Sequence, residues 1–302
     1  MRGLSCYTAN LHRYLAAESD ASALVAGSVR LAVRVDSARG LLAFSHHEPS
    51  LDRLPDGSRL RYAGAPTPAE ALAAVAGELA EHGRALVVVD SSRLPWSVTR
   101  AGPPTPHWLL VDGRRAGGWH VVDGFAALLP AGEQRPHHGW SSEGCLREAM
   151  TLPGHWAPEH ELRIAMAFGS PVAVPPGTAL WLSRAPGGPS RASGEGPLAQ
   201  GRWLRGDAEV LPFLASHLVE RGAAASVHLD DLWAAAAHRS FSYRWHLAHG
   251  AGRPGLEAKL AHWERLPQLI RFAIESAGRG RPRPSLVRSA LELVLAAGEP
   301  QG

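Results

Sequence analysis

The sequence is poor in the features that mark several common classes of protein. Its 302 residues include only two cysteines, Cys6 and Cys145, which do not make a disulfide framework. Lys259 is the only lysine, and no basic block or aromatic-interleaved basic stripe accompanies the formal charge of +3. Nucleic acid is therefore not an expected partner. No segment approaches the ~18 continuous apolar residues of a membrane span.

The first residues also lack the apolar run of a signal peptide. We therefore expect a cytoplasmic protein with no membrane partner, in which Cys6 is a free thiol. Neither G-x-S-x-G nor a phosphate-cradling glycine loop occurs, which argues against an α/β serine hydrolase and a nucleotide enzyme. The 16 histidines include adjacent pairs such as His46-His47 and His137-His138, but no H-E-x-x-H or paired C-x-x-C. We expect no metal site and no cofactor.

Local patterns predict an α+β fold. "APTPAEALAAVAGELAEHG" (65–83) predicts a helix with Thr67 as its N-cap and Pro68 at its first position, and "ALVVVD" (85–90) predicts a buried strand. From Glu209 onward, helical patterns dominate. We expect residues 1–150 to form one domain with an antiparallel sheet, and residues 151–302 to form a mainly helical second domain. The second domain includes a Pro/Gly-rich segment near 171–206.

The segment "LSCYTANLHRYL" predicts a helix that starts beside Cys6, with Ser5 as its N-cap. A thiol at a helix N-terminus feels the positive end of the dipole, which favours the nucleophilic thiolate. The first backbone N–H groups of this helix are candidates for an oxyanion hole, and the Asn10 side chain is a weaker candidate for the same role.

"HWLLVDGRRAGGWHVVDG" predicts a β-hairpin with a five-residue loop. In that register Leu110 faces His120, and His107 faces Asp123 on one face at the open end. A slip of one residue would turn one partner to the other face. His107 is then the candidate base for the Cys6 thiol, and Asp123 is the carboxylate that orients the imidazole.

Other residues compete for these roles. Asp90 ends the buried strand and is the rival carboxylate. Asp112 lies at the loop end of the hairpin, away from His107. Cys145, in "SSEGCLREAM", is the alternative nucleophile, although its position predicts the start of a short helix in which it packs.

Four stretches together resemble a known family: "CYTANLHRYLA", "EALAAVAGELAEHGRALVVVDSSRLPW", "PHWLLVDGRRAGGWHVVDG" and "LAHWERLPQLIRFAIESA". The order of cysteine, histidine and aspartate is that of papain-like peptidases, especially those that process bacteriocin leaders. The closer resemblance is to the butirosin biosynthesis protein H-like family of antibiotic gene clusters. By position, Cys6, His107 and Asp123 match the family's catalytic residues.

The resemblance implies a papain-like catalytic domain and transfer of an acyl group from a carrier-protein thioester to an amine. An acyl carrier protein with its phosphopantetheine arm would be the donor partner, and a small amine the acceptor. Papain-like peptidases carry a glutamine just upstream of the cysteine, and the five residues before Cys6 include none. The family also often has "DP" after the hairpin, where this chain has "DG".

Three alternatives to acyl transfer remain open at this point. The same acyl-enzyme could be resolved by water or by an internal nucleophile, which gives a thioesterase or a cyclase. A peptidase or amidase would use the same three residues, and the missing glutamine counts against it. A relative with a decayed triad would bind a carrier protein or a small molecule without catalysis.

Overall fold

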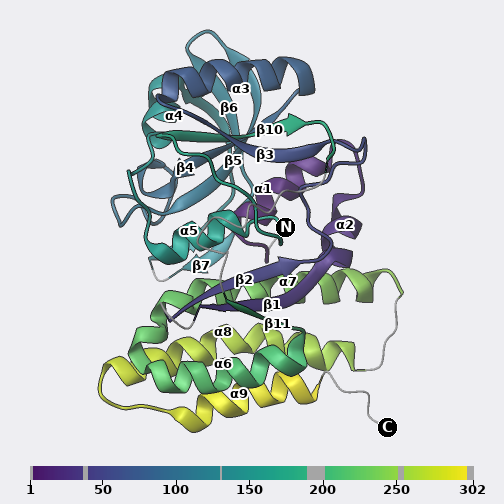
Figure 1. Ribbon diagram of the computed structural model, residues 1–302, viewed down its shortest axis with the longest axis vertical. Coiled ribbons are helices and arrows are strands. Elements are labelled where there is room, and N and C mark those ends of the chain that lie inside the picture. The colour runs from purple at the N-terminus through teal and green to yellow at the C-terminus, as the bar shows by residue number, and fades with distance from the viewer. Residues whose placement is uncertain (1–2, 37–39, 130, 189–200, 251–254, 298–302) are drawn as a thin grey trace. The chain divides into compact units, whose positions relative to one another are not determined.

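The computed structural model describes residues 3–36, 40–129, 131–188, 201–250 and 255–297. Its antiparallel sheets and helices make an α+β protein, as the sequence predicts. The chain divides into two compact units, and each is built from two separate stretches of sequence (Figure 1). Unit 1 comprises residues 1–24 and 50–199, and unit 2 comprises residues 25–49 and 200–302.

Unit 1 contains a six-stranded antiparallel sheet in the order β3-β10-β4-β5-β6-β9. A separate two-stranded sheet pairs β7 with β8. The elements of this unit are α1 (Cys6–Leu15), β3 (Arg59–Ala65), α3 (Pro68–His82), β4 (Ala85–Asp90), the 3₁₀ helix η1 (Ser91–Arg93), β5 (Pro106–Arg115), β6 (Gly118–Asp123), β7 (Ala127–Leu129), β8 (Gly132–Gln134), β9 (His137–Ser142), α4 (Glu143–Ala149), α5 (Pro158–Ala165) and β10 (Ala179–Ala185). Helix α2 (Ala21–Ser28) crosses the boundary between the units.

The helix α3 begins and ends as its sequence predicts. The Thr67 hydroxyl accepts a hydrogen bond from the Glu70 amide, Pro68 occupies the first helical position, and Gly83 ends the helix with φ 71°. Its apolar side contributes Leu72 and Val75 to a core with strand residues of the central sheet. In Figure 1, α3 and α1 lie on opposite sides of this sheet.

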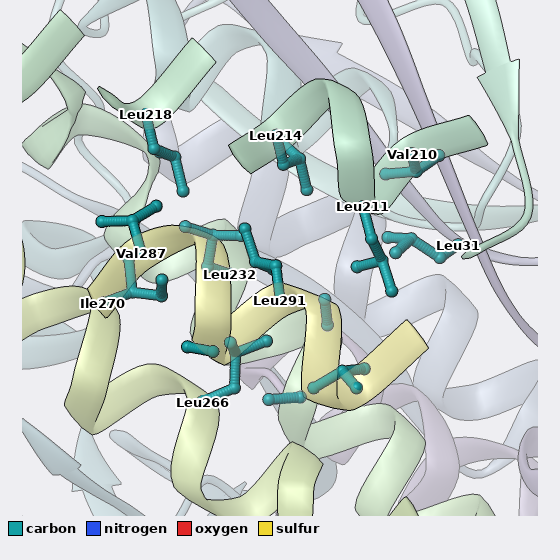
Figure 2. Packing of buried hydrophobic residues seen from close by; sticks show 14 of the residues in the cluster. Leu31, Val210, Leu211, Leu214, Leu218, Leu232, Leu266, Ile270, Val287 and Leu291 are labelled. Atoms are coloured by element: carbon teal, nitrogen blue, oxygen red, sulfur yellow. The ribbon is translucent and has the colours of Figure 1, made fainter. Parts of the chain in front are cut away.

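Unit 2 has a three-stranded sheet in the order β11-β1-β2, together with the long helices of the second half of the chain. Its elements are β1 (Val29–Asp36), β2 (Leu41–His47), β11 (Arg202–Arg205), α6 (Asp207–Arg221), the 3₁₀ helix η2 (Gly222–His228), α7 (Leu229–Ala248), α8 (Leu256–Gly278) and α9 (Pro284–Ala296). Figure 2 shows how Leu211 and Leu214 of α6, Ile270 of α8 and Leu291 of α9 pack in the core of this unit.

The two units do not coincide with the expected domains at 1–150 and 151–302, because strand pairing crosses that boundary. The strand β10 lies between β3 and β4 in the first sheet. Its residues up to Leu182 are buried, so their backbone N–H and C=O groups need hydrogen-bond partners on both edges of the strand. The early strands β1 and β2 instead join β11 in unit 2. The Pro/Gly-rich segment near 171–206 thus contributes β10 to one unit and β11 to the other, and its residues 189–200 lie outside the described part of the chain.

The predicted β5–β6 hairpin forms, but the predicted register and loop are wrong. A two-residue loop joins Arg115 to Gly118, and an irregularity between Val111 and Gly113 shifts the pairing. Leu110 therefore faces Val122, two residues from the expected partner. Because side chains alternate with a period of two, a shift by two residues leaves each side chain on the face that was predicted.

Within the described residues, none of the helices combines the length and the apolar character that a membrane span requires.

Candidate functional site

The first component of the site is Cys6, the first residue of α1. Ser5 caps this helix as predicted, since its hydroxyl accepts a hydrogen bond from the Thr8 amide at 3.3 Å. Cys6 is a free thiol and is half-buried. The helix end therefore presents a reachable sulfur at the positive end of its dipole.

The second component is a histidine–carboxylate pair at one end of the β5–β6 hairpin. His107 is the second residue of β5, and Asp123 is the last residue of β6. His107 Nε2 lies 3.0 Å from Asp123 Oδ2, and both side chains are almost completely buried. The observed register, continued by one pair, places Asp123 opposite Leu109, and hence on the face that carries His107. The expected His107–Asp123 pairing is diagonal rather than direct.

Asp123 is held by donors on both carboxylate oxygens. Trp96 Nε1 donates to Oδ2 at 3.1 Å, so this oxygen faces both Trp96 and His107. The Phe125 amide donates to Oδ1 at 3.0 Å, and Asn10 Nδ2 approaches the same oxygen at 3.4 Å. Contacts from several parts of the chain therefore fix the orientation of the carboxylate.

The electrostatics of the pair favour an imidazolium ion. Burial by itself would lower the pKa of His107, but the charges of Asp123 and Cys6, with hydrogen bonds to both, raise that pKa to about 10. Burial would likewise raise the pKa of Asp123. The His107 charge and hydrogen bonds from His107, Phe125 and Trp96 instead lower it. The Cys6 thiol is an electrostatic neighbour of His107, since its interactions with the ring are among the causes of that raised pKa.

Asn10 does not occupy the position that an oxyanion role requires. Its side chain is completely buried, and Nδ2 donates to the Trp108 carbonyl at 2.7 Å and to the Cys6 carbonyl at 3.1 Å. Its Oδ1 accepts a hydrogen bond from the Gly124 amide at 2.8 Å. The carboxamide is thus directed into the protein, and the backbone amides at the start of α1 remain the candidates for oxyanion binding.

The rival residues have other contacts. Asp90 caps η1 and accepts hydrogen bonds from the Ser92 and Thr105 amides. Asp112 contacts His120 at 2.6 Å. Cys145 lies in the first turn of the short helix α4, where its amide donates to the Ser142 hydroxyl. The structure thus brings Cys6, His107 and Asp123 together and gives each rival a local role.

Trp96 is a site residue that sequence reasoning did not single out. It lies in the Pro-rich loop between η1 and β5, and its ring stacks on His137 with centroids 4.0 Å apart and an interplanar angle of 12°. His137 is paired with Asp123 across β6 and β9. The signal in the sequence was a lone tryptophan after a buried strand that ends in aspartate, which by itself does not indicate a site residue.

The described residues include no group of three or more His, Cys, Asp or Glu side chains that could hold a metal ion. Comparison with models of protein families and with curated proteins finds no match to this sequence.

Proposed function

We propose that this protein is a cysteine-dependent acyltransferase with a papain-like catalytic unit that acts in natural-product biosynthesis. The observation that carries the proposal is the convergence of Cys6, at a helix N-terminus, with the buried His107–Asp123 pair. The order of these residues along the chain and the motifs around them resemble the butirosin biosynthesis protein H-like family. The proposed donor is an acyl thioester on the phosphopantetheine arm of a carrier protein, and the acceptor is an amine.

In the first half-reaction the Cys6 thiolate attacks the thioester carbonyl carbon. A carbon–sulfur bond forms to Cys6, and the bond to the donor sulfur breaks. The imidazolium of His107 gives its proton to the departing thiolate, which leaves as a thiol. The exchange of one thioester for another is nearly isoenergetic, so a thiol nucleophile suits this donor. The backbone amides that begin α1 stabilise the transient oxyanion.

In the second half-reaction the acceptor amine attacks the Cys6 thioester. Neutral His107 takes a proton from the amine nitrogen, the bond to Cys6 sulfur breaks, and an amide forms. The resting thiolate and imidazolium are restored, with Asp123 orienting the ring throughout. Water in place of the amine would turn the same intermediate into a hydrolysis product, so exclusion of water decides between transfer and thioesterase activity.

The test is intact-mass spectrometry after the protein is mixed with short acyl-thioester mimics. We expect an acyl-sized mass gain on wild type and on Cys145→Ala, the matched control for the second partly exposed thiol, and none on Cys6→Ala. Candidate amines added to the acyl-enzyme should release an amide. Release of free acid alone would identify a thioesterase, and absence of an adduct across a broad thioester panel would overturn the enzymatic proposal.

A further inference from the structure

One buried carboxamide contacts the backbone beside all three members of the proposed triad. Asn10 Nδ2 donates to the carbonyl of Cys6 itself and to the carbonyl of Trp108, which follows His107. Asn10 Oδ1 accepts from the amide of Gly124, which follows Asp123. These opposite roles fix which end of the carboxamide is oxygen, because the two carbonyls need a donor and the amide needs an acceptor.

This carboxamide extends from helix α1 to both strands of the hairpin. Trp108 and Gly124 lie two residues beyond the last observed pair of β5 and β6, Leu110 with Val122, so the same register continued would place them opposite each other. Asn10 connects the Trp108 carbonyl to the Gly124 amide, so its side chain bridges the two strands like an inserted peptide group. The helix that carries Cys6 is thereby joined to the open end of the hairpin that carries His107 and Asp123.

The same side chain also touches the carboxylate, since Asn10 Nδ2 lies 3.4 Å from Asp123 Oδ1. Neither water nor another group can readily replace these contacts, because the Asn10 side chain is 0% exposed. A shorter residue would leave the Trp108 carbonyl and the Gly124 amide buried with one partner fewer, and α1 would lose these two hydrogen bonds to the end of the hairpin.

We propose that Asn10 is a positioning residue that sets the placement of the Cys6 sulfur relative to His107 and Asp123. This inference rests on the proposed function, in which Cys6 is the nucleophile. The effect of Asn10 on the reactivity of Cys6 can nevertheless be measured without any acyl substrate. Misplacement of reacting groups by about 1 Å can lower a rate by about 100-fold. A residue that only stabilises the fold would not produce such a change in the folded protein.

The test compares the rate of Cys6 alkylation by iodoacetamide at pH 6 in a Cys145→Ala background. Asn10→Ala is paired with Val75→Ala, a core truncation on α3 that destabilises the same unit from the side of the sheet opposite α1. We expect alkylation of Asn10→Ala to fall by about tenfold or more, and that of Val75→Ala to stay within about twofold of the parent. Equal rates in the two folded variants would overturn the proposal. Asn10→Ser, which keeps a short polar group, provides a second variant if the alanine does not fold.

A wild-type measurement supplements the variants. The Asn10 carboxamide proton resonances should shift as His107 titrates, because Asp123 links the two groups. Invariant resonances would count against the proposed coupling. The two proposals fail separately. If wild type forms no acyl-enzyme but is alkylated rapidly in a way that depends on Asn10, only the acyltransferase proposal is overturned. If wild type forms an acyl-enzyme but the alkylation rate of Cys6 does not depend on Asn10, only the positioning role is overturned.

Discussion

The imidazole rings of His47 and His238 lie 4.8 Å apart in the interior of unit 2. His47 is on β2 and His238 is on α7, and both are almost completely buried. Ser28 Oγ lies 2.9 Å from His47 Nδ1, and the ring of His46 meets that of His238 edge-on at 5.0 Å. Burial, assisted by the charge of His46, lowers the pKa of His47 to about 3, and burial and both neighbouring histidines lower that of His238 well below its ordinary value.

Two neutral histidines in the folded state make the stability of unit 2 sensitive to acid. Below their unfolded pKa of about 6.5, the unfolded chain binds protons that the folded chain does not. The free energy of unfolding should therefore fall as pH drops from about 6.5 toward 3, by about 1.4 kcal/mol per pH unit for each histidine. Urea unfolding at a series of pH values measures this slope.

The matched control is His262→Gln, which changes a partly exposed histidine on α8 of the same unit. Replacing His238 by glutamine should reduce this slope by about 1.4 kcal/mol per pH unit, and His262→Gln controls for the loss of a histidine from the same unit. An unchanged slope in His238→Gln would show that this residue does not remain neutral in the folded protein.

Asp123 should control the protonation of His107. Asp123→Asn removes the larger of the two charges that raise the pKa of His107, and it leaves both the burial that lowers this pKa and the contribution of Cys6. The pKa of His107 should therefore fall from about 10. Loss of the imidazolium disfavours the thiolate, and alkylation of Cys6 at pH 6 should slow by about tenfold or more. Nuclear magnetic resonance titration of His107 and the alkylation rate are the two readouts.

The same hairpin supplies a control for this variant. Asp112 contacts His120 at 2.6 Å, and Asp112→Asn removes a comparable carboxylate from a partly exposed pair. Alkylation of Cys6 should be unaffected there. A similar loss of reactivity in both variants would mean that hairpin integrity, rather than the charge of Asp123, determines the state of the thiol.

The hydrogen bond from Trp96 to Asp123 should limit how far Asp123 raises the pKa of His107. Its indole N–H donates to the oxygen that faces His107, and this hydrogen bond contributes to the lowered pKa of Asp123. Trp96→Phe keeps a ring that can stack on His137 but removes the donor. With one donor fewer, Asp123 Oδ2 becomes more basic, and the pKa of His107 should rise by about half a unit or more.

The control for Trp96 is Trp140→Phe, which alters a half-exposed indole in β9 whose ring contacts His120. The titration of His107 should be the same in this variant as in wild type. A fall in the pKa of His107 in Trp96→Phe would indicate that the indole orients the carboxylate more than it withdraws charge.

Much of the candidate site was predictable because its signals are local. Ser5 and Thr67 are capping residues at the positions where helices begin, and "ALVVVD" forms a strand over its whole length. The faces of His107 and Asp123 were also predictable, because the error in register was an even number of residues. Local sequence therefore decided which elements form and which side each residue occupies.

The rest depended on contacts between distant segments. Nothing in "ALWLS" indicates that β10 pairs with β3 and β4, which precede it by about a hundred residues. The irregularity around Asp112 and the two-residue loop were not apparent from composition either. The oxyanion role suggested for Asn10 failed for the same reason: its partners, Trp108 and Gly124, come from a hairpin about a hundred residues away.

Gly124 should be intolerant of substitution because α1 packs closely against it. A Cβ at this position would lie 2.7 Å from Arg13 Nε and 3.2 Å from the Ala9 carbonyl. The Arg13 side chain can move, but the Ala9 carbonyl belongs to the helix backbone. We expect Gly124→Ala to lower the free energy of unfolding by about 1 kcal/mol, whereas Gly154→Ala, where a Cβ meets nothing within 4 Å, should have little effect.

Comparing Gly124→Pro with Gly124→Ala separates the effect of an added side chain from the effect of losing the amide hydrogen. Proline has no amide hydrogen, so Asn10 Oδ1 would lose its donor, at a further cost of about 1–3 kcal/mol. If the two residues act through that bond, Asn10→Ala should cost less in the Gly124→Pro background than in wild type, as measured by urea unfolding of the four proteins in the cycle. Strict additivity would show that each residue stabilises the hairpin end independently.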